Sequence, residues 1–242
     1  MREIVRQELL ARRLDEQIAA RFPVGQRLRI LDVGMGRGVQ ALRLARAGHE
    51  VTGLEADAAL LHIARETLAT EPEGIRERVR LVEGDCRETG VHFLPGAFDV
   101  VLCHRVLMES QEPDATLAGL ARMLAPRGLL SLLVRNADAL ALGPGLAGDW
   151  DGALGALDPG ADRRGTGVRA DRLEALTATL AGIAAPLHAW YGIQVFTGWG
   201  ADAPPPAAEA LERLLTAEDR AGRTDPYRRV AALLHLCGAR DS

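Results

Sequence analysis

A glycine-rich turn between an apolar run and a helical pattern is the feature that most constrains how this chain folds. The run 30–33 leads into Gly34, Gly36 and Gly38, and a helical pattern starts at Val39. A strand, a glycine turn and a helix in this order bring the backbone of an open α/β sheet close to a nucleotide-like ligand. Glycine suits the turn because a Cβ would block that approach or forbid a positive φ.

Apolar runs alternate with helical patterns along most of the chain, which predicts a parallel sheet with helices on both faces. The predicted strands are 28–33, 50–55, 79–83, 98–103, 129–134, 187–197 and 229–236. The predicted helices are 3–21, 39–48, 57–69, 113–124, 170–182 and 204–222. The last two strands are expected to form an antiparallel closing pair.

The length of 242 residues and the hydrophobic share of 48% favour one domain, 1–242, with a sizeable core. An N-terminal helix is expected over 1–22 and a ligand-binding core over 28–134. Residues 136–168 are rich in Gly, Ala and Asp and show weak helical periodicity, so we expect a lid or substrate segment there. Closing helices and strands are expected over 170–242.

Composition excludes several classes of protein. The formal net charge is −4 and all 29 basic residues are arginines, whereas nucleic-acid-binding modules are usually strongly basic. Cys86, Cys103 and Cys237 are too widely spaced for a disulfide framework, and no metal site is predicted. We therefore expect a reducing, cytoplasmic location. The sequence contains no run of about 18 apolar residues, which is the length that would predict a membrane span.

Three acids follow or end the first three predicted strands. Asp32 lies two residues before Gly34, where a carboxylate can receive the amino group of a ligand's amino-acid part. Glu55 ends the second strand, where a carboxylate can accept two hydrogen bonds from a ribose diol. Asp85 follows the third strand and can accept a hydrogen bond from the exocyclic amine of adenine.

Each acid also has a purely structural interpretation. Asp32 can partner the backbone of the turn, Glu55 can be a solvated strand-end acid, and Asp85 can be a helix N-cap. Asp57 competes with Glu55 for the ribose, but Asp57 is better placed to cap the helix that follows. The order of the acids at three successive strand ends favours one adenosine-containing ligand.

Five segments resemble the class I S-adenosylmethionine-dependent methyltransferases. They are 31–38, 51–55, 83–86, 98–102 and 124–130, the last with Arg127 in place of a family glycine. The resemblance implies a Rossmann-like, seven-stranded, mostly parallel sheet with an antiparallel last strand. It also implies S-adenosylmethionine as methyl donor and S-adenosylhomocysteine as product.

The resemblance further implies which residues hold the methyl donor. They are Asp32, Gly34, Met35, Gly36, Gly38, Glu55, Ala56, Gly84, Asp85, Cys86 and His104. His104 and Arg135 are the candidate catalytic residues, and Arg105 is a further cation at the same strand ends. His104 is either a general base, part of the adenosyl pocket or a packed histidine. Arg135 either grips an anionic acceptor or pairs with acids of 136–168.

A narrower resemblance concerns the methyl acceptor. Segments 103–109, 132–137, 191–196 and 225–229 are similar to the tRNA 5-carboxymethoxyuridine methyltransferase group, which methylates the carboxylate of a modified wobble uridine. That group carries an aromatic residue where this chain has Arg135.

Other functions remain open at the level of sequence. The resemblance predicts O-methylation of tRNA, and a small molecule or natural product is the alternative acceptor. A non-catalytic adenosylmethionine-binding partner subunit is a further alternative. An NAD-dependent oxidoreductase fits less well because its usual turn is G-x-G-x-x-G. The oligomeric state is not predicted.

Overall fold

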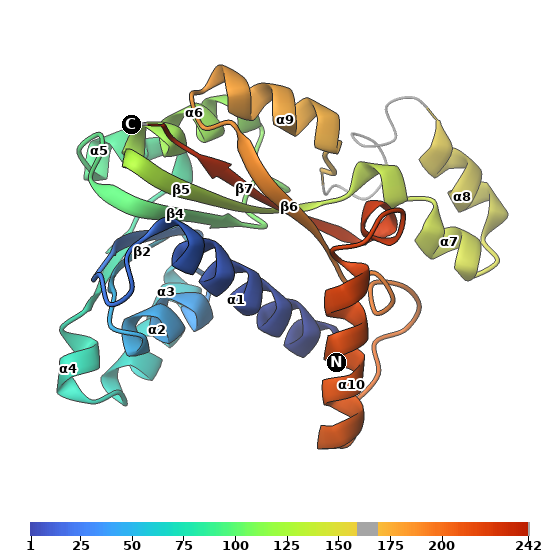
Figure 1. Cartoon of the computed structure of the whole chain (residues 1–242), viewed down its shortest axis with the longest axis horizontal. Helices are drawn as coiled ribbons and strands as arrows, with labels where there is room; N and C mark the ends of the chain where they lie inside the picture. The colour runs from blue at the N-terminus through green and yellow to red at the C-terminus, as the bar shows by residue number, and fades with distance from the viewer. Residues whose placement is uncertain (159–168, 242) are drawn as a thin grey trace.

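The computed structural model describes residues 1–158 and 169–241, and these contain a seven-stranded sheet with the order β3-β2-β1-β4-β5-β7-β6 (Figure 1). The strands are β1 (Arg29–Val33), β2 (Glu50–Glu55), β3 (Val79–Glu83), β4 (Phe98–His104), β5 (Leu124–Arg135), β6 (Leu187–Ile193) and β7 (Leu233–Ala239). β7 runs antiparallel to both β5 and β6, and the other neighbouring pairs are parallel. The predicted fold class is confirmed.

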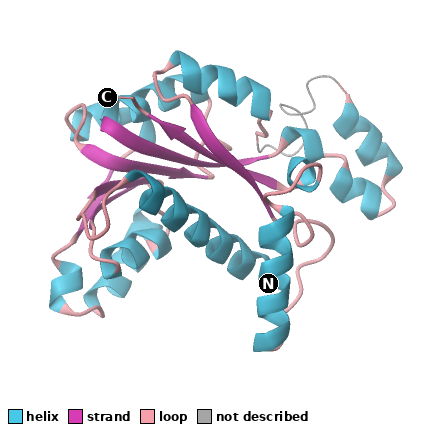
Figure 2. Cartoon of the chain, viewed as in Figure 1, coloured by secondary structure: helices cyan, strands magenta, loops and turns pink. Residues whose placement is uncertain are grey.

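Helices cover both faces of the sheet (Figure 2). They are α1 (Arg2–Arg21), α2 (Val39–Arg46), α3 (Ala58–Ala69), α4 (Glu73–Arg76), α5 (Thr89–His92), α6 (Pro113–Met123), α7 (Leu142–Leu146), α8 (Trp150–Leu157), α9 (Leu173–Gly182) and α10 (Ala208–Ala221). No helix among the described residues is long and apolar enough to cross a membrane.

The core forms two layers because successive side chains of a strand point to opposite faces. Ile30 of β1 packs in a cluster with Leu14 of α1 on one face. Its neighbour Leu31 packs in a second cluster with Leu120 of α6 and Leu180 of α9 on the other face. Figure 1 shows α1 and α9 on opposite sides of the sheet.

The strand order reverses beside β1, and this places the glycine turn. The chain passes from β1 outward to β2 and β3, then returns to add β4 on the other side of β1. In open α/β sheets, ligands bind at such a switch point, outside the carboxyl ends of the strands. Gly34 directly follows β1 at that point.

The last strand differs from its predicted bounds. A strand was expected over 229–236, but β7 begins at Leu233. The Asn136 side chain donates hydrogen bonds to the carbonyls of Arg229 and Ala231, both at 2.8 Å. These bonds occupy backbone groups that a sheet would need, so the segment before β7 forms a short 3-10 turn instead.

Two other element boundaries also shift. β6 ends at Ile193 instead of 197, because Gln194 has φ 63° and turns the chain out of the sheet. β5 begins at Leu124 instead of 129, with Arg127 at φ 63° inside it. Arg127 thus adopts the left-handed conformation that glycine takes most readily, which suits the family glycine that the resemblance implies at this position.

Residues 136–168 were expected to form a partly helical lid or substrate segment. The described part, up to residue 158, contains α7 and α8, which extend beside the sheet in Figure 1. Residues 159–168 lie outside the described part of the chain. α9 begins at Leu173 instead of 170, after Asp171 forms a β-bridge with Asn136.

Candidate active site

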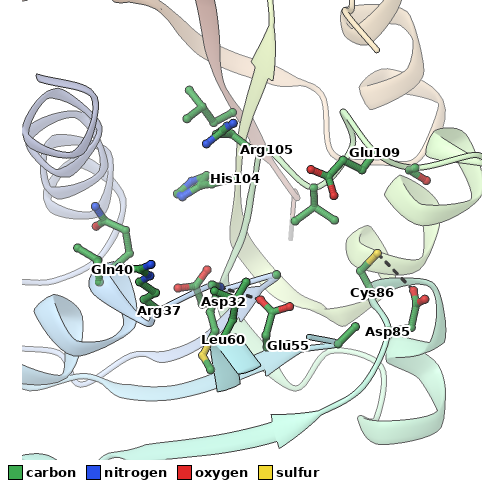
Figure 3. A pocket seen from close by; sticks show the side chains of 18 of the residues that line it. Asp32, Arg37, Gln40, Glu55, Leu60, Asp85, Cys86, His104, Arg105 and Glu109 are labelled. Atoms are coloured by element: carbon green, nitrogen blue, oxygen red, sulfur yellow. Dashed lines mark hydrogen bonds between the residues drawn. The ribbon is translucent and has the colours of Figure 1, made fainter. Parts of the chain in front are cut away.

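A pocket of about 670 Å³ opens at the carboxyl ends of β1, β2 and β4 (Figure 3). This volume lies in the usual range for ligand and cofactor sites. Most of the residues predicted to hold the ligand line it: Asp32, Gly34, Met35, Gly36, Glu55, Ala56, Gly84, Asp85, Cys86 and His104. Gly38 does not line it; it caps α2 with φ 78°.

The structure shows why the turn has glycine at two positions. Gly34 has φ 62°, and a Cβ there would lie 2.3 Å from Cγ2 of Val106. Gly36 has φ 59°, and a Cβ there would meet no atom within 4 Å. Gly34 is therefore required by packing, whereas the space beside Gly36 belongs to the pocket and lets a ligand approach the backbone.

The Glu55 carboxylate is held in place by backbone donors at the end of β2. Its Oε2 accepts a hydrogen bond from Gly36 N–H at 2.7 Å, and its Oε1 accepts one from Asp57 N–H at 3.0 Å. Asp57 in turn accepts from Ala59 and Leu60 N–H, so the predicted helix cap is confirmed. A carboxylate has about four acceptor positions, so Glu55 keeps some for a ligand diol.

Asp32 is a buried acid, with 3% of its surface exposed. Burial, and to a smaller extent the nearby Glu55, raises its pKa to about 7, against the opposite effect of a hydrogen bond from the Ala41 backbone N–H. Figure 3 shows the Asp32 and Glu55 side chains close together in the pocket. A cation that binds beside Asp32 would favour its ionised form.

Asp85 combines two interactions at the pocket rim. Its carboxylate accepts from Arg87 N–H at 2.8 Å, which confirms the predicted capping role, and pairs with the Arg87 guanidinium at 2.6 Å. Arg87 holds the pKa of Asp85 well below its usual range. Burial raises the pKa of the Cys86 thiol to about 11, so this residue is no nucleophile at neutral pH. Adenine recognition by Asp85 stays a prediction.

His104 lines the pocket as a neutral imidazole. Its Nε2 lies 2.9 Å from Ser131 Oγ on β5. Burial, and to a smaller extent the positive charges of Arg6 and Arg43, lowers its pKa to about 3. A general base works best when its pKa is near the working pH, so His104 is a weak base here.

Arg105 is a cation at the same side of the pocket as His104 (Figure 3). Its backbone has φ 70°, and its N–H donates to Leu133 carbonyl at 2.7 Å. Its side chain forms no hydrogen bond or ion pair with the residues that the structure describes. A left-handed non-glycine residue costs free energy, and such strain gathers at functional sites.

Arg6 and Arg37 also line the pocket, and the sequence prediction missed both. Burial lowers the pKa of Arg6, Glu3 opposes this, and Arg105 adds to it. Arg6 comes from α1, almost 100 residues before Arg105. Arg6 and Arg13 are seven residues apart, hence on one face of α1, but nothing in the sequence marks that face as the one that reaches the pocket.

Arg135 does not line the pocket. It ends β5, and its carbonyl accepts a hydrogen bond from Asp171 N–H at 2.9 Å. No residue of 136–158 lines the pocket either, within the part of the chain that the structure describes. The proposed roles of Arg135 and of a lid stay predictions.

Comparison with known proteins agrees with this geometry. Residues 31–132 match the family described as "Methyltransferase domain". The chain is 32% identical over 147 residues to the tRNA 5-carboxymethoxyuridine methyltransferase of Escherichia coli (strain K12), covering 61% of this chain and 54% of that protein. It is 34% identical over 116 residues to a ubiquinone biosynthesis O-methyltransferase of Xanthomonas euvesicatoria pv. vesicatoria (strain 85-10), covering 47% and 46% of the two chains.

These matches span about half the length of the curated relatives. The fold is also that of magnesium protoporphyrin IX methyltransferase from Synechocystis PCC 6803, solved with bound S-adenosylhomocysteine. That comparison has a TM-score of 0.64 and 18% identity, and it covers 99% of this chain and 85% of the other. With a methyltransferase-domain match over residues 31–132, this sheet order and a glycine turn at the switch point, the chain is similar in sequence and fold to the class I S-adenosylmethionine-dependent methyltransferases.

Proposed function

We propose that this chain transfers the methyl group of S-adenosylmethionine to an oxygen of an anionic acceptor, with a carboxylate as the favoured group. The observation that carries the proposal is that two residues lie together in the pocket wall. Arg105 is a cation without an ion-pair partner among the described residues, and His104 is a weak base. A carboxylate is already ionised at neutral pH and needs no base. It needs a cation to hold it, and arginine suits this task.

The pocket residues fit S-adenosylmethionine part by part. Asp32 would bind the ammonium of the amino-acid part, and Glu55 would bind the ribose diol. The open space beside Gly36 would admit the ligand close to the backbone. Arg6 and Arg37 would supply positive charge for the ligand carboxylate. The ligand's sulfonium supplies an already activated methyl group, so the protein has to orient the acceptor and exclude water.

Two acceptors deserve a test. A modified uridine of tRNA is favoured by the similarity to the Escherichia coli enzyme, whose name gives tRNA 5-carboxymethoxyuridine as its substrate. A small molecule is favoured by the net charge of −4 and by the similarity to ubiquinone biosynthesis O-methyltransferases. A cytoplasmic location fits both acceptors and is part of the proposal.

Calorimetry and nucleoside analysis test the proposal in two stages. Titration with S-adenosylmethionine, S-adenosylhomocysteine and NAD should show binding of the two sulfur ligands only, and tight NAD binding would contradict the donor assignment. Mass spectrometry of tRNA nucleosides from a deletion strain should show loss of a methyl ester on the wobble uridine. An unchanged nucleoside profile would contradict the tRNA acceptor and favour a small-molecule acceptor.

Replacing Arg105 with Asn should weaken the acceptor and spare the methyl donor. Asn removes the charge yet tolerates the positive φ at this position. A lost charge-assisted hydrogen bond corresponds to about 1.5–3 kcal/mol, which is roughly a 10- to 100-fold rise in the acceptor KM. Steady-state kinetics measures this, and calorimetry should find the affinity for S-adenosylmethionine unchanged.

Arg127→Asn is the matched control for this experiment. Arg127 also has a positive φ, but it lies outside the pocket. Its variant should leave the acceptor KM unchanged. An equal rise in both variants would mean that backbone strain, and not pocket charge, causes the effect.

A further inference from the structure

A buried chain of three side chains lies behind the pocket histidine. Ser131 Oγ lies 2.9 Å from Nε2 of His104 and 2.8 Å from Nε2 of His235 on β7. Ser131 and His235 are fully buried. Burial also holds the pKa of His235 well below its ordinary value, so both imidazoles are neutral at neutral pH. The two histidines therefore share one hydroxyl between β4 and β7.

The single proton of that hydroxyl couples the two rings. Ser131 can donate to one histidine only. The other Nε2 must carry its own proton and donate it to Ser131 Oγ. A neutral imidazole has one protonated nitrogen, so His104 and His235 hold opposite tautomers. Either His104 carries its proton on Nδ1 and His235 on Nε2, or the reverse.

The surroundings favour Nε2–H on His235. Nδ1 of His235 is buried and finds no hydrogen-bond partner among the described residues. Nδ1 of His104 is buried without a partner among these residues in the same way, so an orphaned donor arises in either arrangement and the partners of the two Nε2 atoms decide between them. Cys237 Sγ lies 3.6 Å from Nε2 of His235 and can weakly accept from the same N–H.

Nδ1 of His104 has a different environment. It too is buried without a partner among the described residues, but His104 belongs to the pocket wall. Nε2 is already bonded to Ser131, so Nδ1 is the ring nitrogen left for a bound molecule. Arg105 lies on the same side of the pocket (Figure 3), where the proposed acceptor brings an oxygen with negative charge.

We propose that His235, acting through Ser131, is a positioning residue that fixes His104 as the Nδ1–H tautomer, so that the pocket histidine is a neutral hydrogen-bond donor to the acceptor oxygen. The hydrogen bond from His104 to the acceptor oxygen rests on the proposed function. The tautomer itself does not, because it depends on the shared hydroxyl and on the contact of His235 Nε2 with Cys237, and it can be measured without any ligand.

Nitrogen-15 NMR of the ligand-free protein tests the tautomer directly. Protonated and unprotonated ring nitrogens resonate in separate regions, and His104→Gln and His235→Gln identify the two rings by loss of their signals. We expect a protonated Nδ1 on His104 and a protonated Nε2 on His235. A protonated Nε2 on His104 in the wild-type protein would overturn the proposal, whatever the enzyme's activity.

A pair of variants at position 235 tests the coupling. In His235→Gln the side-chain amide can still donate to Ser131, so His104 should keep its Nδ1–H pattern. In His235→Leu no donor remains, and His104 should lose that single pattern. Identical His104 spectra in the two variants would contradict the relay. If His235→Leu does not fold, Ser131→Ala gives the same comparison by removing the shared hydroxyl.

Kinetics separates this proposal from the proposed function. With an active acceptor, His235→Leu should raise the acceptor KM while His235→Gln stays close to wild type. If no carboxylate acceptor is methylated but the NMR pattern holds, the proposed function fails and the tautomer assignment stands. If a carboxylate acceptor is methylated but the wild-type protein shows the reversed tautomer, the tautomer assignment fails and the proposed function stands.

Discussion

Asp32→Asn should weaken S-adenosylmethionine binding by about 100-fold at neutral pH, or roughly 3 kcal/mol, because it removes the buried carboxylate that we propose pairs with the ligand ammonium. Calorimetry measures the change. Asp99→Asn is the control, since Asp99 is an acid of β4 that pairs with Arg29 outside the pocket. Unchanged affinity in the Asp32 variant would show that this acid serves the turn alone.

The wild-type protein should bind this ligand with a pH optimum. Asp32 has a pKa of about 7 in the free protein, so below that pH the carboxyl must lose a proton before it can pair with the ammonium. Affinity should fall by up to about tenfold for each pH unit below that value. The ligand α-amino group loses its own proton near pH 8, so affinity also falls above that pH. Asp32→Asn should abolish the acidic limb only.

The same substitution should stabilise the ligand-free fold at high pH. The folded-state pKa of Asp32 lies above the ordinary value of 3.8, so ionised Asp32 destabilises the folded state. This cost is absent below pH 3.8, grows as pH rises toward 7, and is complete above 7. It corresponds to about 4 kcal/mol at most. Urea unfolding at about pH 5 and about pH 8 should show the gain for Asp32→Asn mainly at the higher pH, and a loss at both would contradict it.

Local sequence was sufficient for the parts of the site that follow directly from β1 and β2. The glycines, Glu55 and Asp57 act within about 25 residues of one another, through turn geometry and backbone hydrogen bonds. The parallel pairing of β1 to β5 follows from the same local units, because a helix after each of β1 to β4 returns the chain.

What the sequence could not show depends on contacts between distant segments. Arg6 reaches the pocket only because α1 packs across the sheet, and no motif marks it. His235 meets Ser131 across 104 residues, through the antiparallel pairing of β5 with β7. The start of β7 depends on Asn136, whose amide binds carbonyls more than 90 residues later. Periodicity within a segment carries no information about such partners.

The turn after β6 also depends on a distant segment, and the residue that binds it gives the second large predicted effect. Glu218 of α10 is fully buried and binds the turn that follows β6. Its Oε2 accepts from Val195 N–H at 2.7 Å, and its Oε1 accepts from Phe196 N–H at 3.1 Å and from Thr197 N–H at 2.7 Å. The Thr197 hydroxyl adds a fourth bond at 2.6 Å. One carboxylate thus accepts hydrogen bonds from three backbone N–H groups of a turn that pairs with no strand.

Glu218→Ala should destabilise the protein by about 3–5 kcal/mol, because it leaves several buried donors without an acceptor. Glu218→Gln should cost less, since the amide oxygen can replace Oε1 while its nitrogen faces Val195 N–H. Glu212→Ala, on the exposed side of α10, should change the free energy of unfolding by no more than about 0.5 kcal/mol. Urea unfolding followed by circular dichroism measures all three. Equal losses for Glu218→Ala and Glu212→Ala would mean that the turn is held by its own backbone. The predicted order, Ala worse than Gln and both worse than the control, requires that the carboxylate itself holds the turn that follows β6.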